Sequence, residues 1–281
     1  MLEYEIKKPL ISVLGVSKVI NGKVILRDIG IDGKPFIISD IIRPGMKQGQ
    51  RVAVVGRSGS GKSTLFKLMA GIYHPTTGSV RIPDPNNSEN YEIVEAGDIG
   101  FVQQSYPLSR NETVFRMLMD AARQGHIPRK DRATVVKDYL ETWGLKSQIF
   151  QSVKQLSGGQ KQRVAIIEQI LCSHHFIIFD EPFSGLDVKN IEDVKRSFDQ
   201  ITTSDEINTV IFSTHDIHLA VELSDTIIVL GYEKDPAGKV IPGGTIIAEY
   251  NLMEMGLAWE PYGEGHRKLA TEIQNLIINN S

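Results

Sequence analysis

Residues 56–64, near the start of the chain, have the composition and spacing of a phosphate-binding loop. They read Gly-Arg-Ser-Gly-Ser-Gly-Lys-Ser-Thr, which fits the pattern of Gly, four residues, Gly-Lys and Ser or Thr. Glycines let the backbone turn so that several N–H groups face inward, and the positive end of the following helix also attracts an anion. Lys62 can reach the β- and γ-phosphates of a nucleotide, and the Ser63 hydroxyl can ligate Mg²⁺. The predicted phosphate-binding residues are Gly56, Arg57, Ser58, Gly59, Ser60, Gly61, Lys62, Ser63 and Thr64.

Two neighbouring carboxylates, Asp180 and Glu181, follow an apolar run at residues 176–179. This run is typical of a buried strand, and a strand of the same sheet can place Asp180 near a metal ion at the phosphate loop. Glu181 can accept a proton from an attacking water. Acidic strand ends are common and are usually only solvated, so this signal gains its weight from the phosphate loop upstream.

A second candidate anion site lies at residues 156–160, which read Leu-Ser-Gly-Gly-Gln and precede a helix predicted over 163–171. Small residues and free N–H groups at the start of a helix attract anions. The alternative is a simple helix cap led by Ser157. Because one chain with one phosphate loop should not need two phosphate cradles, a second copy or a relative is expected to use this one. The segment therefore predicts a dimer that sandwiches ATP.

The elements that position these residues alternate between strand and helix. Short β-branched and apolar runs predict strands at 52–55, 99–102, 176–179, 209–212 and 226–230. Good helix formers follow at 63–70, and helical periodicity covers 112–145, with Val114, Met117, Leu118 and Ala121 on one face. The alternation predicts an α/β core with a mainly parallel sheet. Residues from about 106 to 164 interrupt it and are predicted to form an inserted helical lobe, whereas 83–90 are predicted to be an exposed loop.

Composition limits the class of protein further. The 281 residues are 41% hydrophobic and 23% charged, which allows a sizeable core and excludes disorder as the main state. The strongest apolar runs are too short to span a bilayer, and the first residues lack the apolar stretch of a signal peptide. The single cysteine, Cys172, cannot form an internal disulfide, which fits a reducing compartment. A net charge of −3 argues against nucleic-acid binding through bulk charge.

Taken in order, GRSGSGKST, LSGGQ, FIIFDEP and STHD resemble the motifs of the ATP-binding cassette (ABC) family of ATPases, over roughly residues 10–230. The resemblance implies a phosphate-loop (RecA-like) α/β core with a mainly parallel sheet, an N-terminal antiparallel β subdomain and an inserted helical lobe. It also implies domain boundaries. We expect the core and its β subdomain at 1–105 and 165–249, the helical signature lobe at 106–164, and a C-terminal helical extension at 250–281.

The same resemblance assigns roles to residues outside the phosphate loop. Glu181 matches the general base, Asp180 the metal-binding acid, and His215 the switch histidine that hydrogen-bonds the γ-phosphate. In the segment IGFVQQS, spacing favours Gln104 as the glutamine that contacts Mg²⁺ and the lytic water, although Gln103 is adjacent.

Further roles concern the opposite protomer. Ser157 and Gly159, within the signature segment that also contains Gly158 and Gln160, match the residues that bind the γ-phosphate held by the partner. Asp187, in SGLD, matches the position that crosses the dimer interface.

Three features depart from the family or are less readable. At the position where the family stacks adenine on an aromatic side chain, this sequence has Ile20, which implies a weaker apolar contact. The segment 30–47 is longer than usual, and we expect an extended β-hairpin in the N-terminal sheet rather than a new site. Residues 264–280 place Leu269, Ile273 and Leu276 on one helical face, so they predict a helix that packs on the core or, alternatively, makes a regulatory or dimer contact.

The function implied by the resemblance is an ATP-binding and ATP-hydrolysing subunit of an ABC transporter, with ATP and Mg²⁺ as cofactors. Its expected partners are a second nucleotide-binding subunit (identical or different) and transmembrane permease subunits docked on the helical lobe, with an extracytoplasmic substrate-binding protein as a further candidate and no nucleic acid. Its expected location is cytoplasmic and peripheral, on the inner face of the membrane. The segments EPFSGLD and THDIHLAVELSD resemble importers of the nitrate, sulfonate or taurine type, and export of a lipid or drug stays open.

The sequence leaves one other class open and disfavours the rest. A regulatory ABC ATPase, coupled to a membrane cell-division or signalling complex, would carry indistinguishable motifs. Relatives that act on DNA or ribosomes need a long coiled-coil insertion or two cassettes in one chain, and neither pattern is present. A phosphate-loop kinase of small molecules is disfavoured by LSGGQ and by the acid pair followed by a histidine.

Overall fold

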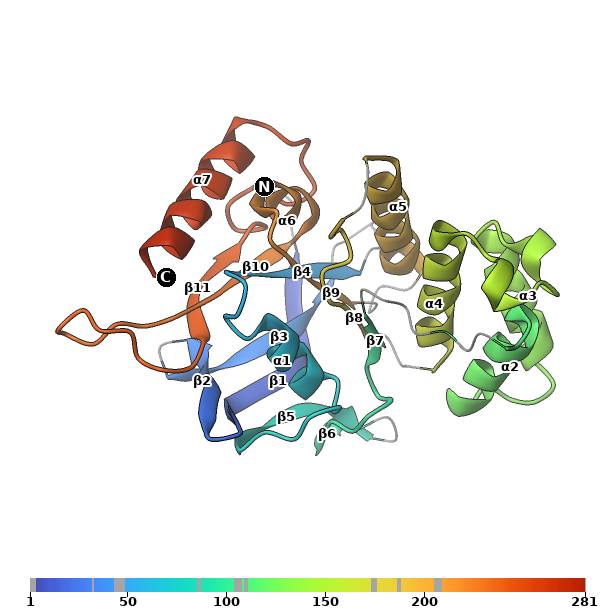
Figure 1. Cartoon of the computed structure of the whole chain (residues 1–281), viewed down its shortest axis with the longest axis horizontal. Coiled ribbons are helices and arrows are strands. Elements are labelled where there is room, and N and C mark those ends of the chain that lie inside the picture. Colours follow the sequence, from blue (N-terminus) through green and yellow to red (C-terminus); the bar gives the residue numbers. More distant parts are fainter. Residues whose placement is uncertain are drawn as a thin grey trace.

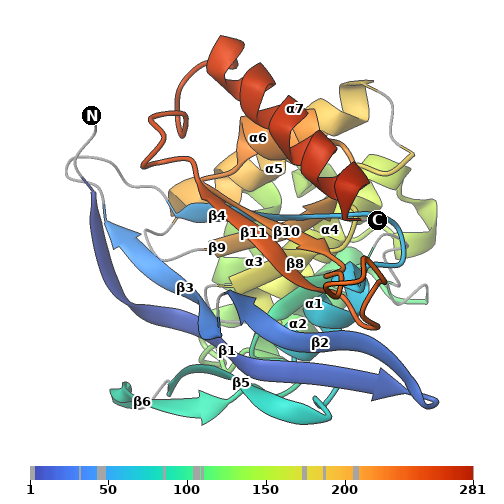
Figure 2. The ribbon, with the colours of Figure 1, turned by 90° about the vertical axis from the view of Figure 1, so that its left-hand side faces the viewer.

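The computed structural model describes residues 4–31, 33–42, 49–84, 87–103, 108, 111–172, 176–185, 188–204 and 209–280. Two β-sheets lie one above the other, with helix α1 (Lys62–Met69) between them (Figures 1 and 2). The buried side chains Leu65, Phe66 and Met69 of α1 belong to one hydrophobic core with residues of both sheets. The second core lies on the opposite face of the α/β sheet, under the remaining helices.

The α/β sheet has the strand order β11-β10-β4-β9-β8-β7. Its strands are β4 (Gln50–Val55), β7 (Gly100–Val102), β8 (Phe176–Phe179), β9 (Thr209–Thr214), β10 (Thr226–Gly231) and β11 (Thr245–Asn251). All neighbouring pairs are parallel except β10 with β11. The inner strands are continuous apolar runs because both of their faces are covered. The mainly parallel α/β core predicted from the sequence is confirmed.

The N-terminal sheet is antiparallel and has the order β2-β3-β1-β5-β6. It contains β1 (Glu5–Ile20), β2 (Lys23–Ile31), β3 (Lys34–Ile42), β5 (Thr77–Asp84) and β6 (Asn87–Ile93). The described part of the long segment 30–47 forms the expected hairpin, in which Gly30 pairs with Pro35 and β3 then pairs along β1. Residues 32 and 43–48 lie outside the described residues.

The prediction of an exposed loop at 83–90 is wrong. Most of the segment belongs to the antiparallel pair β5–β6, in which Arg81 is paired with Ile93 and Pro83 with Tyr91. The Tyr91 hydroxyl also donates a hydrogen bond to the Pro9 carbonyl of β1. The edge strand β6 tolerates polar residues because one side of its backbone needs no strand partner, so polar composition alone did not indicate a loop here.

The helical lobe lies on the side of the molecule away from α7 (Figure 1). It contains α2 (Val114–Gln124), α3 (Arg132–Thr142), the 3₁₀ turns η1 (Lys146–Gln148) and η2 (Val153–Gln155), and the start of α4 (Gly158–Cys172). The predicted helical stretch 112–145 is therefore two helices. Its predicted apolar face on α2 is buried, and α4 begins earlier than the predicted 163. The domain boundaries proposed from the sequence stay a prediction.

The remaining helices pack on the α/β sheet, and the last of them is the C-terminal helix. They are α5 (Val188–Ser204), α6 (Ile217–Leu223) and α7 (Glu264–Asn279). Helix α7 packs on α6 and β10 through Leu269, Ala270 and Ile273, so its predicted apolar face covers the core. Within the described part of the chain, no helix combines the length and apolar character needed to cross a membrane.

Phe198 of α5 joins the helix to the strands that carry the site. Its buried ring lies 5.0 Å from that of Phe179 in β8 and 5.2 Å from that of Phe212 in β9, centroid to centroid. Phe198→Ala is expected to lower the free energy of unfolding by about 3–5 kcal/mol, because it removes a buried aromatic ring and leaves a cavity. Urea unfolding measures this. Phe150→Ala is the control, since Phe150 is 73% exposed and its loss should cost under about 1 kcal/mol. A similar loss of the free energy of unfolding in both variants would contradict the conclusion that Phe198 holds α5 on these strands.

Candidate nucleotide-binding site

The phosphate loop connects β4 to α1 at the carboxyl edge of the parallel sheet. Gly56 has a φ of 151°, and a Cβ at this position would lie 2.2 Å from the Leu230 carbonyl oxygen of β10. Only glycine fits so close to the neighbouring strand. Helix α1 then begins at Lys62, after Gly61. The sequence-predicted strand, loop and helix are therefore present in that order, and the N-terminus of α1 points at the site as an anion-binding end.

Lys62 folds back over the loop that precedes it. Its ammonium donates hydrogen bonds to the carbonyl oxygens of Gly56 at 2.8 Å and Arg57 at 3.3 Å. The same nitrogen lies 3.7 Å from Oε1 of Glu181. The Lys62 side chain is buried, so this positive charge is held in place rather than moving freely in solvent.

Strands β8 and β9 deliver the acidic pair and the histidine to the same edge. The Ser213 hydroxyl, at the end of β9, donates to Oδ1 of Asp180 at 2.9 Å and accepts from the N–H of Glu181 at 2.9 Å. Nδ1 of His215 lies 3.0 Å from Oε2 of Glu181. Glu181 also has a left-handed backbone, with φ of 52°. Ser213 was not singled out from the sequence, although its position in STHD next to His215 was a signal for it.

A cavity of about 460 Å³ opens over the loop. It brings together the predicted residues Lys62, Ser63, Glu181 and His215. The full lining is Ile25, Ser58, Gly59, Gly61, Lys62, Ser63, Thr64, Glu181, Ser184 and His215. Ile25 and Ser184 were missed from the sequence. Ile25 comes from β2 of the other sheet, which no local pattern indicates, whereas Ser184 belongs to the SGLD segment.

Some predicted site residues do not line this cavity, and others lie outside the described residues. Ile20 is half-buried at the end of β1 and does not line this cavity. Gln103 is exposed at the end of β7, whereas Gln104 and Asp187 lie outside the described residues. The roles proposed for Ile20, Gln104 and Asp187 stay predictions.

The signature segment forms the first turn of α4 and its cap. The N–H of Gln160 donates to the Ser157 hydroxyl at 3.3 Å, and the N–H of Ser157 donates to Oε1 of Gln160 at 2.9 Å. This reciprocal pair is a capping box, so the predicted Ser-led cap is present. None of the described residues that line the cavity comes from 157–160. The two candidate anion sites are therefore separate within one chain.

The carboxylate of Glu181 lies between Lys62 and His215, two side chains that can bind phosphate. Glu181 contacts Lys62 through Oε1 and His215 through Oε2. A phosphate held by Lys62 and the N-terminus of α1 would thus lie beside a carboxylate able to accept a proton from water. A parallel sheet with a phosphate loop, an Asp-Glu pair and a histidine at one edge defines a phosphate-loop nucleoside-triphosphate-binding protein.

Comparison with known proteins narrows this class. The sequence profile of the family described as ABC transporter matches residues 40–184, more than half of the chain. The sulfate/thiosulfate import ATP-binding protein CysA 1 of Agrobacterium fabrum is 30% identical over 90% of this chain and 68% of its own length. The spermidine/putrescine import ATP-binding protein PotA of Fusobacterium nucleatum is 31% identical over 85% of this chain and 58% of its own. The chain belongs to the ABC transporter family.

Solved structures agree on the fold. CbiO1 of Clostridium perfringens, described as part of the ABC transporter complex cbiONQ, has a TM-score of 0.66 at 22% identity and covers 97% of this chain and 98% of its own. A structure described as the ATP binding subunit of an ABC transporter also gives 0.66, at 21% identity, over 94% of this chain and 99% of its own. At these identities the likeness concerns the fold. The chain spans 68% of the length of CysA 1, 58% of that of PotA, and 51% to 54% of that of three further sulfate/thiosulfate import ATP-binding proteins.

Proposed function

We propose that this chain binds ATP with Mg²⁺, hydrolyses it, and powers transport through separate membrane subunits. The observation that carries the proposal is the convergence of Lys62, Glu181 and His215 on one cavity at the carboxyl edge of the sheet. Membership of the ABC transporter family supports it, as do the names of relatives, which are ATP-binding proteins of importers.

Hydrolysis follows from the geometry of these groups. The loop N–H groups, the N-terminus of α1 and Lys62 hold the phosphates. Glu181 takes a proton from a water that attacks the γ-phosphorus, the bond to the β–γ bridging oxygen breaks, and ADP and phosphate result. His215 donates a hydrogen bond to the γ-phosphate. Such phosphoryl transfer depends on positioning and charge stabilisation more than on covalent chemistry.

The residues available for Mg²⁺ are oxygen donors of the kind this ion prefers. They are the Ser63 hydroxyl, the Asp180 carboxylate and, as a prediction from the sequence, Gln104. Ser213 fixes the Asp180 carboxylate by donating to Oδ1 at 2.9 Å, so one carboxylate oxygen is oriented and the other is left for a ligand. When bound, the ion neutralises charge on the phosphates.

A second nucleotide-binding subunit, identical or different, completes the site. Ser157, Gly158, Gly159 and Gln160 lie outside the cavity of their own chain, and in the proposal they cover the γ-phosphate of the partner. Asp187 crosses the interface. Closure of the dimer depends on the γ-phosphate, so hydrolysis lets the dimer open again. The pair of subunits is therefore a two-state device biased by ATP.

The membrane contact is placed on the helical lobe, with the chain peripheral on the cytoplasmic face of the membrane. Phe150 is 73% exposed, and its ring meets Phe115 edge-on, with centroids 6.0 Å apart. Exposed aromatic side chains on a rigid helical surface are typical anchors of protein interfaces. Phe115 also lies at the start of α2, within the same lobe.

Import is the favoured direction because relatives are named as import proteins for sulfate/thiosulfate and for spermidine/putrescine. The likeness to nitrate, sulfonate or taurine importers stays a hypothesis. A substrate-binding protein outside the membrane belongs to this hypothesis.

A pull-down of the tagged chain from its native membranes in mild detergent, followed by mass spectrometry, tests the transport proposal. A polytopic membrane subunit is expected, together with Mg²⁺-dependent ATP hydrolysis by the complex. Recovery of only soluble partners would overturn it. Recovery of a division or signalling complex would favour the second candidate, a regulatory ABC ATPase, which the motifs fit equally.

Phe150→Ala is expected to lower the amount of co-purified membrane subunit by at least about tenfold, since loss of an aromatic anchor costs more than about 1.4 kcal/mol of binding. Quantitative mass spectrometry of the pull-down measures this. Ile278→Ala is the control, because Ile278 is 69% exposed on α7, away from the lobe. Unchanged recovery with Phe150→Ala would move the contact to another surface.

A further inference from the structure

The segment that follows β10 contacts the phosphate loop through the side chain of Tyr232. The Tyr232 hydroxyl donates a hydrogen bond to the Gly59 carbonyl at 2.9 Å, joining residues 173 positions apart. Gly59 lies in the middle of the loop and lines the nucleotide cavity. Tyr232 was not a candidate from the sequence.

This hydrogen bond acts on a glycine that is not packed against a neighbouring strand. Gly59 has a φ of 84°, and a Cβ built on it would meet no atom within 4 Å, whereas Gly56 is packed directly against β10. The Cβ side of Gly59 therefore faces open space. The hydrogen bond from Tyr232 is a constraint on this glycine from a distant part of the chain.

Fixing the Gly59 carbonyl also fixes an N–H group. In a trans peptide the C=O of one residue and the N–H of the next point to opposite sides of the same plane. The Ser60 N–H is thus turned away from Tyr232, and it donates to the Arg57 carbonyl at 3.2 Å, which closes the turn of the loop. Phosphate loops bind through inward N–H groups, so the shape of this turn, which places the neighbouring N–H groups, is a determinant of the cradle.

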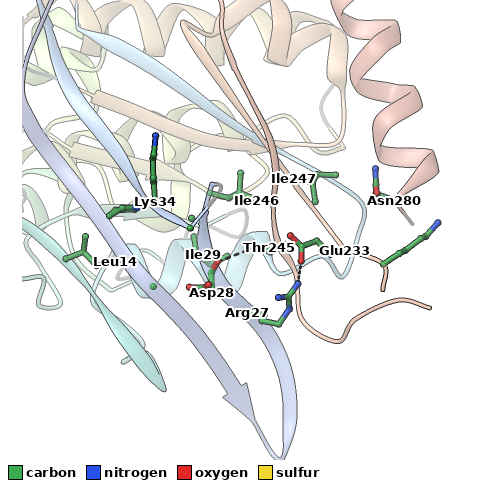
Figure 3. Close-up of a pocket in the computed structure, with 15 residues that line it drawn as sticks. Leu14, Arg27, Asp28, Ile29, Lys34, Glu233, Thr245, Ile246, Ile247 and Asn280 are labelled. Carbon is green, nitrogen blue, oxygen red and sulfur yellow. Dashed lines mark hydrogen bonds and ion pairs between the residues drawn. The ribbon is translucent and has the colours of Figure 1, made fainter. Parts of the chain in front are cut away.

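Tyr232 is itself held by the end of α7 and by β2. Its N–H donates to the Asn280 carbonyl at 3.4 Å, and the Lys234 ammonium donates to the Asn279 carbonyl at 2.7 Å. Glu233 pairs with Arg27 of β2 at 2.5 Å (Figure 3). Figure 3 also shows Asn280, at the end of α7, near this pair.

A cavity borders the segment that carries Tyr232. It has a volume of about 610 Å³ and lies between this segment and the N-terminal sheet, lined by residues that include Arg27, Lys34, Glu233, Lys234 and Asn280. The side chains of Glu233 and Lys234 are exposed. The hydrogen bonds and the ion pair named above therefore help to set the position of Tyr232 beside this cavity.

We propose that Tyr232 is a positioning residue for nucleotide binding, which orients the Gly59–Ser60 peptide of the phosphate loop and is itself aligned by the end of α7. The inference rests on the proposed function, because it concerns the affinity of the same loop for ATP. It gives the C-terminal helix a role in nucleotide binding as well as in packing.

Tyr232→Phe tests the hydrogen bond, since it removes only the hydroxyl. The Kd for ATP and for ADP, measured with a fluorescent analogue and by calorimetry, is expected to rise about three- to tenfold, the effect of one neutral hydrogen bond. KM should rise while kcat at saturating ATP stays within about twofold, because the interaction is the same in ground and transition states. Thermal stability should be unchanged.

Tyr250→Phe is the matched control. The Tyr250 hydroxyl donates to Oε1 of Glu272 at 3.0 Å, so it also links the sheet to α7 but does not touch the loop. Burial, together with this hydrogen bond to Glu272, raises the pKa of Tyr250 to about 12, so the phenol stays protonated. Its removal should leave both Kd values unchanged.

Lys234→Met tests the link to α7, with Lys239→Met, in the same exposed segment, as its control. Lys234→Met is expected to weaken ATP binding about twofold or more alone and to add nothing in a Tyr232→Phe background, because both changes act through one contact. If wild type binds ATP and the Kd of Tyr232→Phe is unchanged, the inference about Tyr232 is overturned but the proposed function is not. An equal loss of ATP affinity in Tyr250→Phe would have the same meaning. A wild-type chain that binds no ATP would overturn the proposed function and, with it, the inference.

Discussion

Glu181→Gln is expected to lower ATP turnover by about 100- to 10,000-fold, the usual contribution of a general base. A glutamine amide keeps the shape of the side chain but cannot accept the proton of the attacking water. The structure adds a second effect. The Glu181 carboxylate lies 3.7 Å from the Lys62 ammonium and 3.0 Å from Nδ1 of His215, where a γ-phosphate would compete for the same two groups.

Removing that negative charge frees Lys62 and His215 for the nucleotide. ATP binding should therefore be retained or strengthened in Glu181→Gln, and the closed dimer should accumulate with ATP because it is not hydrolysed. Phosphate release measures turnover, and size-exclusion chromatography with and without ATP measures the dimer. Glu260→Gln is the matched control, since Glu260 is an exposed glutamate outside the cavity. Turnover equal to wild type in Glu181→Gln would show that another group is the base.

Ser157→Arg is expected to abolish at least about 99% of ATP hydrolysis while ATP binding to the isolated chain stays within about twofold of wild type. The reason is geometric. Ser157 is exposed at the start of α4 and does not line the cavity of its own chain, so an arginine there leaves the cis site intact. In the proposed dimer the same position faces the γ-phosphate of the partner, and a large side chain blocks closure. Loss of one hydrogen-bond donor to the transition state lowers kcat by about 100- to 1,000-fold.

The substitution also removes a helix cap, and this effect must be separated from the loss of closure. Ser157 accepts the hydrogen bond from the Gln160 N–H, and losing it costs about 1 kcal/mol of stability. Ser157→Ala loses the cap and the hydroxyl proposed to contact the partner's γ-phosphate but adds no bulk, so it should retain ATP-dependent dimerisation. Ser147→Arg places the same side chain on an exposed part of the lobe and should leave activity unchanged. If Ser157→Arg failed to bind ATP as a monomer, the signature would belong to the cis site.

Local sequence patterns indicated many of the elements and most of the candidate site. The run from Val52 through the phosphate loop into α1 depends on neighbours in sequence, because β-branched strand residues, glycines with unusual φ and good helix formers act within a few positions. The same holds for the capping box of Ser157 and Gln160. Patterns were weaker where context overrides composition. Residues 83–90 have a turn-rich sequence, yet most of them belong to strands β5 and β6, which pair as a hairpin at the edge of the N-terminal sheet.

The sequence alone indicates the chemistry through a phosphate loop, an acid pair, a signature segment and a histidine, in an order that resembles the ABC family. The tertiary structure is needed to show which of these residues meet. The strand order β10-β4-β9-β8 sets Lys62, Glu181 and His215 around one cavity, adds Ile25 from the other sheet, and brings Tyr232 to Gly59. The physical reason is that local propensity acts over a few residues, whereas strand order is fixed by burying the apolar faces of the whole sheet at once.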